Sequence, residues 1–181
     1  MKRHEFEHVL KAAADIVRDD LVVIGSQALL GRHPDAPSSL LVSMEVDVYP
    51  ATDPGRADEI DGAIGEGSRF HDTYAYYAHG VGPETPIAPA GWEGRRVRLE
   101  LPRIRPKEGT FVAWCMSTAD LVLAKLAAGR PHDLEFAVDA IAAGLVEADQ
   151  LLLGVDLMPE KHREPTRQRL GVVLARLPRP D

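Results

Sequence analysis

The sequence predicts a mixed α/β protein, with a small mixed sheet flanked by helices and a helical C-terminal part. Three patterns support this class. An apolar run over 21–24 ends at Gly25-Ser26, a second apolar run over 42–49 alternates with polar residues, and helical spacing of apolar residues dominates after Ser117. We therefore expect an α/β core over 1–116 and a helical part over 117–181, packed together as one compact unit.

The composition fits an ordinary buried core and a reducing compartment. The chain has 181 residues, 45% of them hydrophobic, and a single cysteine, Cys115. One cysteine excludes an internal disulfide framework and a multi-cysteine zinc site. The first helix lacks the continuous apolar core of a signal peptide, and no stretch is long enough to span a bilayer. We expect a cytoplasmic protein with no membrane partner.

The charge is unevenly distributed along the chain. The formal net charge is -7, which argues against broad nucleic-acid binding. Residues 1–94 carry 7 Lys and Arg against 16 Asp and Glu, whereas residues 95–181 carry 14 against 12. The second half holds basic runs over 95–107 and 161–169 that could meet phosphates, although such runs are more often solvated faces.

The elements of the first half follow from the periodicity of its apolar residues. Amphipathic spacing predicts a helix over 3–18, and four apolar residues predict a short buried strand over 21–24. Ser26 is predicted to cap a helix that runs to about Gly31, and the acid-bearing strand is expected from about Leu40. The remaining predicted elements are a helix over 58–64, a strand over 73–77, an irregular loop over 80–91, and strands over 97–101 and 110–116.

The second half is predicted to be helical. Ser117 and Asp120 form a capping-box-like start to a helix that Gly129 ends. Pro131 suits the first turn of another helix, which extends to Gly144. Two further helices are expected over 148–154 and 159–177.

The second apolar run presents two acids. Its period of two places Ser43, Glu45 and Asp47 on one face of a strand. Carboxylates about 7 Å apart on one strand face repel each other, so they need open water or a cation between them. An exposed sheet face is the simpler interpretation. The alternative is a Mg²⁺ site, with Mn²⁺ as a substitute, in which the acids and a triphosphate share the metal.

Gly25-Ser26 and a later basic cluster could complete a nucleotide site. Gly25 permits a turn that a side chain would obstruct, and the backbone N–H groups after it, with the Ser26 hydroxyl, can hold phosphate oxygens. In isolation, such a pair is more often a turn and a cap. Lys125 could neutralise phosphate charge or extend over the core. Arg130 could contact phosphate while Asp133 supports Lys125 or metal, or Arg130 and Asp133 could simply pair.

The order of these motifs resembles a known family. Val-Ile-Gly25-Ser26-Gln-Ala-Leu, then Ser43-x-Glu45-x-Asp47, then the segment from Asp120 to Phe136 resemble the nucleotidyltransferase-fold toxins of AbiEii and MenT type, over about residues 20–150. The resemblance implies a nucleotidyltransferase-like sheet flanked by helices. It assigns nucleotide contacts to Gly25, Ser26, Ser43, Lys125 and Arg130, metal ligation to Glu45 and Asp47, and catalytic roles to Asp47, Glu45, Lys125 and Asp133.

The resemblance also implies a function. Such toxins transfer nucleotides from a nucleoside triphosphate to RNA, notably the acceptor 3′ end of tRNA, which stops translation, and a cognate antitoxin protein restrains them. We therefore expect a Mg²⁺-dependent nucleotidyltransferase of this kind. The alternatives are transfer to a small molecule or to a protein hydroxyl, and a non-catalytic nucleotide- or partner-binding module of the same fold. Glu100 and Asp139 are candidates for a further catalytic carboxylate.

Overall fold

Five strands form one mixed sheet in the order β3-β2-β1-β5-β4. They are β1 (Leu21–Ile24), β2 (Glu45–Pro50), β3 (Tyr77–Gly80), β4 (Val97–Pro102) and β5 (Thr110–Cys115). β1 pairs antiparallel with β2 and parallel with β5, β2 pairs parallel with β3, and β4 pairs antiparallel with β5. The computed structural model describes residues 1–102 and 109–177. Arg103, Arg105 and Lys107 of the predicted basic run lie outside the described residues.

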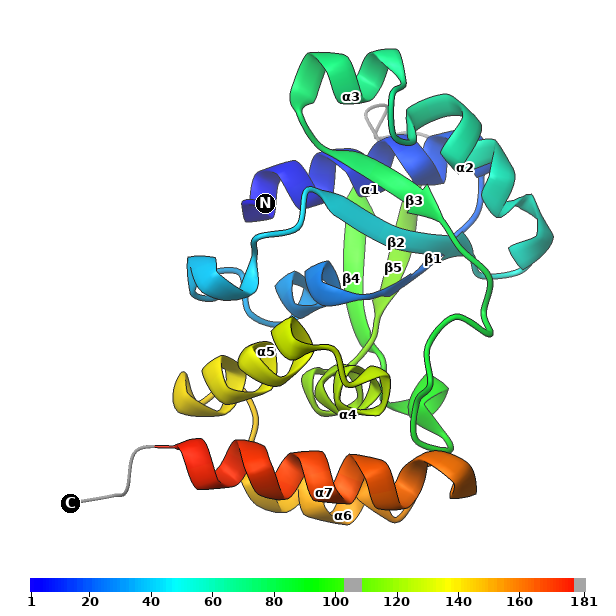
Figure 1. The fold of residues 1–181 in the computed structure, drawn as a ribbon. Coiled ribbons are helices and arrows are strands. Elements are labelled where there is room, and N and C mark those ends of the chain that lie inside the picture. Colours follow the sequence, from blue (N-terminus) through cyan, green and yellow to red (C-terminus); the bar gives the residue numbers. More distant parts are fainter. Residues whose placement is uncertain (103–108, 178–181) are drawn as a thin grey trace.

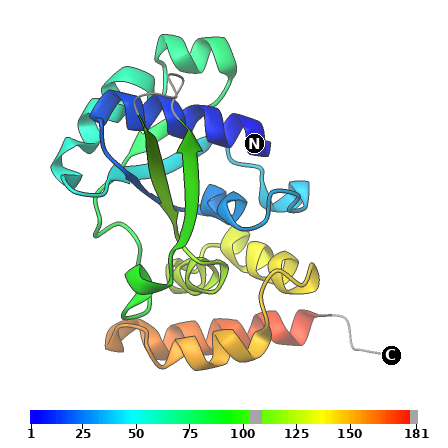
Figure 2. The ribbon, with the colours of Figure 1, turned by 180° about the vertical axis from the view of Figure 1, so that it is seen from behind.

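Helices flank the sheet (Figures 1 and 2). On one side are α1 (Arg3–Val17), α2 (Ala57–Ile64) and α3 (Arg69–Tyr74). Beyond the ends of β4 and β5 that point away from α1 lie α4 (Thr118–Ala128) and α5 (Pro131–Ala142), with α6 (Ala148–Val155) and α7 (Glu160–Arg176) outermost. Short 3₁₀ turns, η1 (Ser26–Gly31), η2 (Ser38–Leu40), η3 (Pro54–Arg56) and η4 (Trp92–Arg95), connect these elements. The structure therefore confirms the predicted mixed α/β class with a helical C-terminal part.

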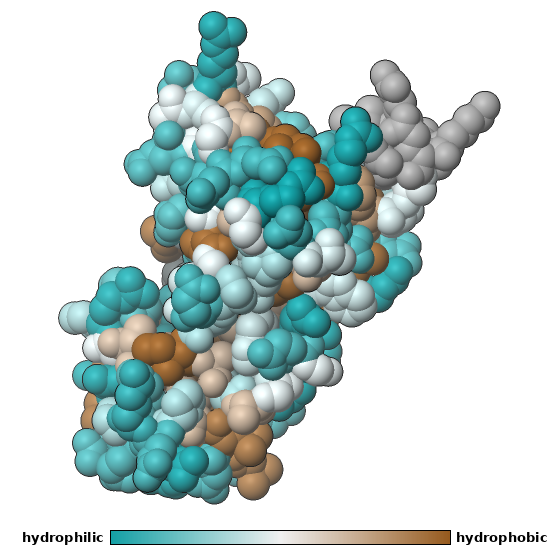
Figure 3. Space-filling model, turned by 90° about the vertical axis from the view of Figure 1, so that its right-hand side faces the viewer, coloured by the Kyte–Doolittle hydropathy of each residue, from teal (hydrophilic) through white to brown (hydrophobic). Residues whose placement is uncertain are grey.

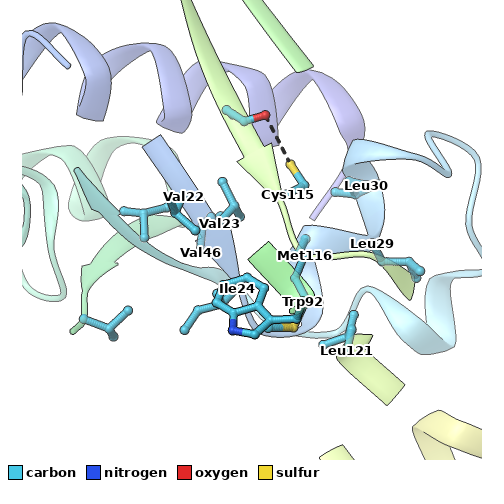
Figure 4. Close-up of a cluster of buried hydrophobic side chains, with 14 of the residues drawn as sticks. Val22, Val23, Ile24, Leu29, Leu30, Val46, Trp92, Cys115, Met116 and Leu121 are labelled. Atoms are coloured by element: carbon cyan, nitrogen blue, oxygen red, sulfur yellow. Dashed lines mark hydrogen bonds between the residues drawn. The ribbon is translucent and has the colours of Figure 1, made fainter. Parts of the chain in front are cut away.

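The central strand β1 is buried on both faces. All four of its residues are at most 2% exposed, and Figure 4 shows Val22, Val23 and Ile24 within a cluster that includes Trp92 and Met116. The same buried cluster extends into the helical part, through residues that include Leu121, Leu126, Leu170 and Val173. Burial on both faces explains why β1 is a continuous apolar run rather than an alternating one.

The acid-bearing strand begins later than the sequence predicts. β2 starts at Glu45, and Val42 and Met44 are 78% and 54% exposed rather than buried with Val46 and Val48. Its pairing with β1 and β3 limits the length of β2. The ladder with β1 ends at the pair Ile24 and Asp47, and the ladder with β3 starts at Glu45. No residue before Glu45 forms a register pair in either ladder, and the last backbone contact is the hydrogen bond from the N–H of Tyr77 to the carbonyl of Met44 at 3.1 Å, so alternation alone could not extend the strand.

Two further predictions on local structure are wrong. The expected strand over 73–77 begins within the helix α3, and β3 starts only at Tyr77. Ser68 caps α3 by accepting a hydrogen bond from the N–H of His71 at 3.2 Å, and Ala75 ends the helix with a positive φ of 61°. Ser26 does not cap its helix, since Gly25 occupies the N-cap position and Ser26 is the first residue of a 3₁₀ turn.

The helices in the part of the chain that the structure describes differ from membrane-spanning helices. None of those helices combines the length and hydropathy needed to cross a bilayer. Hydrophilic residues dominate the face shown in Figure 3, where hydrophobic areas are small and separated.

Candidate nucleotide site

Asp47 lies at the centre of the site, on a strand flanked by β1 and β3. On the β1 side, Gly25 follows the strand with φ 68° and ψ -176°, a combination essentially restricted to glycine. A β-carbon on Gly25 would approach Oδ2 of Asp47 more closely than the 3.0 Å that real side chains tolerate. Gly25 is therefore required both for its backbone conformation and for its closeness to the acid.

On the other side of β2, each acid contacts a side chain of β3. The hydroxyl of Tyr77 donates a hydrogen bond to Oε2 of Glu45 at 3.0 Å, and Nδ1 of His79 lies 3.0 Å from Oδ1 of Asp47. Burial and the hydrogen bond to Glu45 raise the pKa of Tyr77 to about 12. Tyr77 therefore stays protonated and remains a donor at neutral pH.

The ionised form of the Asp47 carboxyl group is disfavoured in the folded protein. Its burial raises the pKa of its carboxyl group, and repulsion from Glu45 raises the pKa further, which outweighs the opposing effects of His79 and Lys125. Two acids on one strand face thus repel each other without enough positive charge between them. A bound cation would remove that repulsion.

A cationic cluster is built around Asp133. Its carboxylate is fully buried and accepts hydrogen bonds from Nζ of Lys125 at 3.1 Å and from Nε of Arg130 at 2.7 Å. Burial opposes ionisation of Asp133, but the bonds from Arg130 and Lys125 outweigh it and lower the pKa of the carboxyl group. Lys125 also lies 4.7 Å from the ring centre of Phe136. Asp133 therefore holds two cations in fixed positions.

One cavity brings the acid and the cations together. It has a volume of about 160 Å³ and is lined by Gly25, Asp47, Lys125 and Arg130. Its apolar wall includes Ile24, Met116 and Leu121, which Figure 4 shows gathered near Trp92. Residues Thr85, Pro86 and Ile87 of the loop after β3 complete the lining. Four separate segments of the chain thus converge on one opening.

Other predicted site residues lie beside the cavity rather than in its lining. The Ser43 hydroxyl contacts the backbone of Glu45 at 3.1 and 3.3 Å, where it shapes the start of β2. Ser26 and the Glu45 side chain are also outside the lining. Ser26 forms no side-chain hydrogen bond within the described ranges. Asp139 lies further along α5 and does not line the cavity.

Glu100 is too distant to act with the two acids. It lies on β4, three strands away from β2 in the sheet, which corresponds to about 14 Å. Its carboxylate pairs with Arg98 at 2.6 Å. The ion pair explains why this acid lies within a basic run.

Much of the predicted basic surface is engaged in local contacts. Arg95 forms a bidentate pair with the buried Asp120, and Arg96 contacts Trp114 and the carbonyl of Glu93. On α7, Arg163 donates to the carbonyl of Met158, Arg167 pairs with Asp156, and Arg169 donates to the carbonyls of Leu126 and Ala127 at the end of α4. These arginines therefore take part in contacts within the fold, an outcome that neither a phosphate-binding surface nor a solvated face describes.

Sequence reasoning missed Tyr77, His79 and the loop residues 85–87. Tyr77 and His79 follow each other at the strand period of two, but the strand predicted over 73–77 ends before His79, so the sequence pattern does not show their alignment with the acids. No motif marks Thr85, Pro86 or Ile87, which reach the cavity only through the course of an irregular loop.

The acid pair suits a metal that is shared with a substrate. Within residues 1–102 and 109–177, no group of three or more His, Cys, Asp and Glu is arranged to hold a metal ion. Mg²⁺ is commonly bound by one or two carboxylates together with substrate phosphates and water. Glu45 and Asp47 offer oxygen donors and unrelieved negative charge, so these residues fit Mg²⁺ with a bound nucleotide.

The small mixed sheet, the glycine turn after β1 and the acids on β2 define a nucleotidyltransferase-like fold. The chain belongs to the family described as nucleotidyltransferase of unknown function (DUF6036), whose model matches residues 4–153. No curated protein and no solved structure shows significant similarity to the chain. The match supports the predicted enzyme class. The specific resemblance to AbiEii and MenT toxins stays a prediction.

Proposed function

We propose that the protein is a Mg²⁺-dependent nucleotidyltransferase that transfers a nucleotide from a nucleoside triphosphate to RNA. The acceptor 3′ end of tRNA is the first candidate substrate, and a cognate antitoxin is the expected partner. One observation carries the proposal: Asp47, Lys125 and Arg130 line the same cavity beside Gly25. A negative metal-binding side and a positive phosphate-binding side therefore face one space.

The residues have complementary roles in the proposed reaction. The oxygen of the acceptor hydroxyl forms a bond to the α-phosphorus, the bond between that phosphorus and the bridging oxygen of the β-phosphate breaks, and pyrophosphate leaves. The hydroxyl proton passes to a water molecule beside Asp47, while Lys125 and Arg130 neutralise the departing pyrophosphate. Mg²⁺ held by Glu45 and Asp47 would supply further positive charge at the phosphates. Catalysis then depends on the positioning of the hydroxyl and the triphosphate and on neutralisation of charge.

An RNA end could reach this site without a broad basic surface. Only the terminal hydroxyl has to enter the cavity, and the side chain of Arg130 is 62% exposed beside it. The resemblance to RNA-modifying toxins supports RNA as the acceptor. The engagement of Arg95 and Arg96 in local contacts means that long-range RNA binding would draw little on them.

The direct test is transfer of radioactive label. Purified protein, Mg²⁺ and each α-labelled nucleoside triphosphate are incubated with total RNA, and the products are separated by size. We expect labelled tRNA with the wild type and none with Asp47→Ala, whereas Asp35→Ala, which removes an exposed acid of a loop, should retain labelling. Nucleotide binding without any transfer would instead indicate a non-catalytic module.

A small-molecule acceptor is the second candidate function, and a second cavity has room for a small molecule. This cavity has a volume of about 610 Å³ and lies against the N-terminal end of α4, with Arg32, His33, Arg95 and Asp120 in its lining. Its volume is in the range of about 300–1,000 Å³ typical of small-molecule sites. Labelled products of low molecular mass from a metabolite extract, without labelled RNA, would support this alternative.

A further inference from the structure

Two side chains of β3 contact the two acids of β2, one to one. The strands run parallel, and their register places Tyr77 beside Glu45 and His79 beside Asp47. Each pair is joined at 3.0 Å, from the Tyr77 hydroxyl to Oε2 of Glu45 and between Nδ1 of His79 and Oδ1 of Asp47. One strand thus carries the carboxylates and its neighbour carries a polar partner for each.

We propose that Tyr77 and His79 are positioning residues that hold Glu45 and Asp47 in the orientation needed to bind a divalent cation. The inference rests on the proposed function, because it assigns the cation to these acids. Without such partners, mutual repulsion would turn the two carboxylates apart toward water. Tyr77 fixes Glu45, whereas Asp47 is held between His79 on one side and Gly25 on the other.

The contacts leave one oxygen of each carboxylate available. Within the described part of the chain, Oε1 of Glu45 and Oδ2 of Asp47 accept no hydrogen bond, since Tyr77 and His79 contact the other oxygen in each case. Ligating carboxylates are commonly held by hydrogen bonds of this kind, and removal of the partner typically weakens metal binding or activity about 10–100-fold. The arrangement is therefore what a shared cation site requires.

Because the side chains of His79 and Asp47 are accessible to water, an effect on the site can be distinguished from an effect on stability. The side chains of His79 and Asp47 are 50% and 24% exposed, and pairs this accessible to water contribute little to folding. Tyr77→Phe removes only a hydroxyl. Loss of either contact is therefore expected to change cation binding far more than the unfolding midpoint.

The experiment is titration of the protein with Mn²⁺ alone, followed by electron paramagnetic resonance of the free ion. Tyr77→Phe and His79→Leu are expected to weaken Mn²⁺ binding about 10–100-fold, with unfolding midpoints unchanged. His79→Asn keeps a donor near the position of Nδ1 and should restore most of the affinity. Tyr76→Phe is the matched control, because its hydroxyl contacts His8 at 2.7 Å rather than an acid.

Several results would overturn the inference. One is Mn²⁺ binding by Tyr77→Phe and His79→Leu with the affinity of the wild type. The others are an equal loss of Mn²⁺ affinity in Tyr76→Phe, or no Mn²⁺ binding by the wild type. Label transfer is measured in parallel as a function of Mg²⁺ concentration. If the wild type binds Mn²⁺ in this residue-dependent way but transfers no label, the positioning roles stand and the proposed transfer fails.

Discussion

Gly25 lies so close to Asp47 that a β-carbon on residue 25 would approach Oδ2 of the carboxylate within 3.0 Å. The two residues belong to neighbouring strands, since Ile24, just before Gly25, pairs directly with Asp47. A side chain at position 25 must therefore displace the carboxylate. The glycine of the predicted phosphate loop also sets the position of the predicted metal ligand.

Gly25→Ala is expected to abolish nucleotide transfer. The methyl group would move Asp47, and the backbone conformation at position 25 would add strain of about 1–3 kcal/mol. Label transfer and urea unfolding measure the two effects. Gly62→Ala is the matched control, because a methyl group there enters open space on α2 and should stabilise the helix by about 0.5–1 kcal/mol. Wild-type transfer by Gly25→Ala would contradict the model of the site.

Asp47→Asn is expected to stabilise the protein at pH 7 while it removes activity. The pKa of Asp47 is raised in the folded protein above its usual 3.8. The folded state therefore keeps a proton that the unfolded chain has lost, and stability falls as the pH rises from about 3.8 through the raised pKa. Asparagine carries no charge, so the variant does not lose stability as the pH rises through this range.

Urea unfolding at pH 7 checks this prediction. The midpoint of Asp47→Asn should exceed that of the wild type, and Asp35→Asn, which changes an exposed loop acid, should leave the midpoint unchanged. A midpoint for Asp47→Asn below the wild-type value would show that Asp47 stabilises the fold instead.

Asp133→Asn is expected to destabilise the protein strongly. The change leaves Lys125, which is 11% exposed, without its carboxylate partner, and removal of one member of a buried pair typically costs about 3–5 kcal/mol. The pKa of Asp133 is lowered in the folded state. Its stabilising effect is therefore complete above about pH 3.8 and is lost as the pH falls through the lowered pKa.

The measurement is the free energy of unfolding of the wild type and Asp133→Asn at several pH values. The difference in unfolding free energy between the two proteins should be largest at neutral pH. It should decrease in acid, because the Asp133 carboxylate of the wild type becomes protonated there. A difference that is small and independent of pH would contradict a charged role for Asp133.

The α/β core and the helical part are expected to unfold together. The buried cluster includes residues on both sides of the predicted boundary at 116, and the cavity takes Asp47 from one part and Lys125 from the other. The two tryptophans, Trp92 and Trp114, lie in the first part, whereas much of the helical signal comes from the second. Fluorescence and far-ultraviolet circular dichroism should give coincident transitions. Separate midpoints would show two independent units.

The sequence indicates which residues could carry the chemistry of the site, but not how the fold arranges them. Gly25, Asp47, Lys125 and Asp133 could be chosen because their residue types and order are unusual among apolar runs. The exposure of Val42 and Met44 could not be predicted from the sequence, because the start of β2 depends on where β1 and β3 can pair with it. Likewise, the contacts of Tyr77 and His79 with the acids depend on register, which no local pattern specifies.

The cavity takes its acid from β2 and its cations from α4 and the start of α5. Because the ribosome makes the chain from its N-terminus, the acids emerge long before Lys125 and Arg130. A nascent chain that ends between them carries the repelling carboxylates without the cations that would hold a triphosphate. The site can therefore assemble only after α5 has left the exit tunnel, so synthesis of the second half controls when the protein first becomes able to bind its nucleotide.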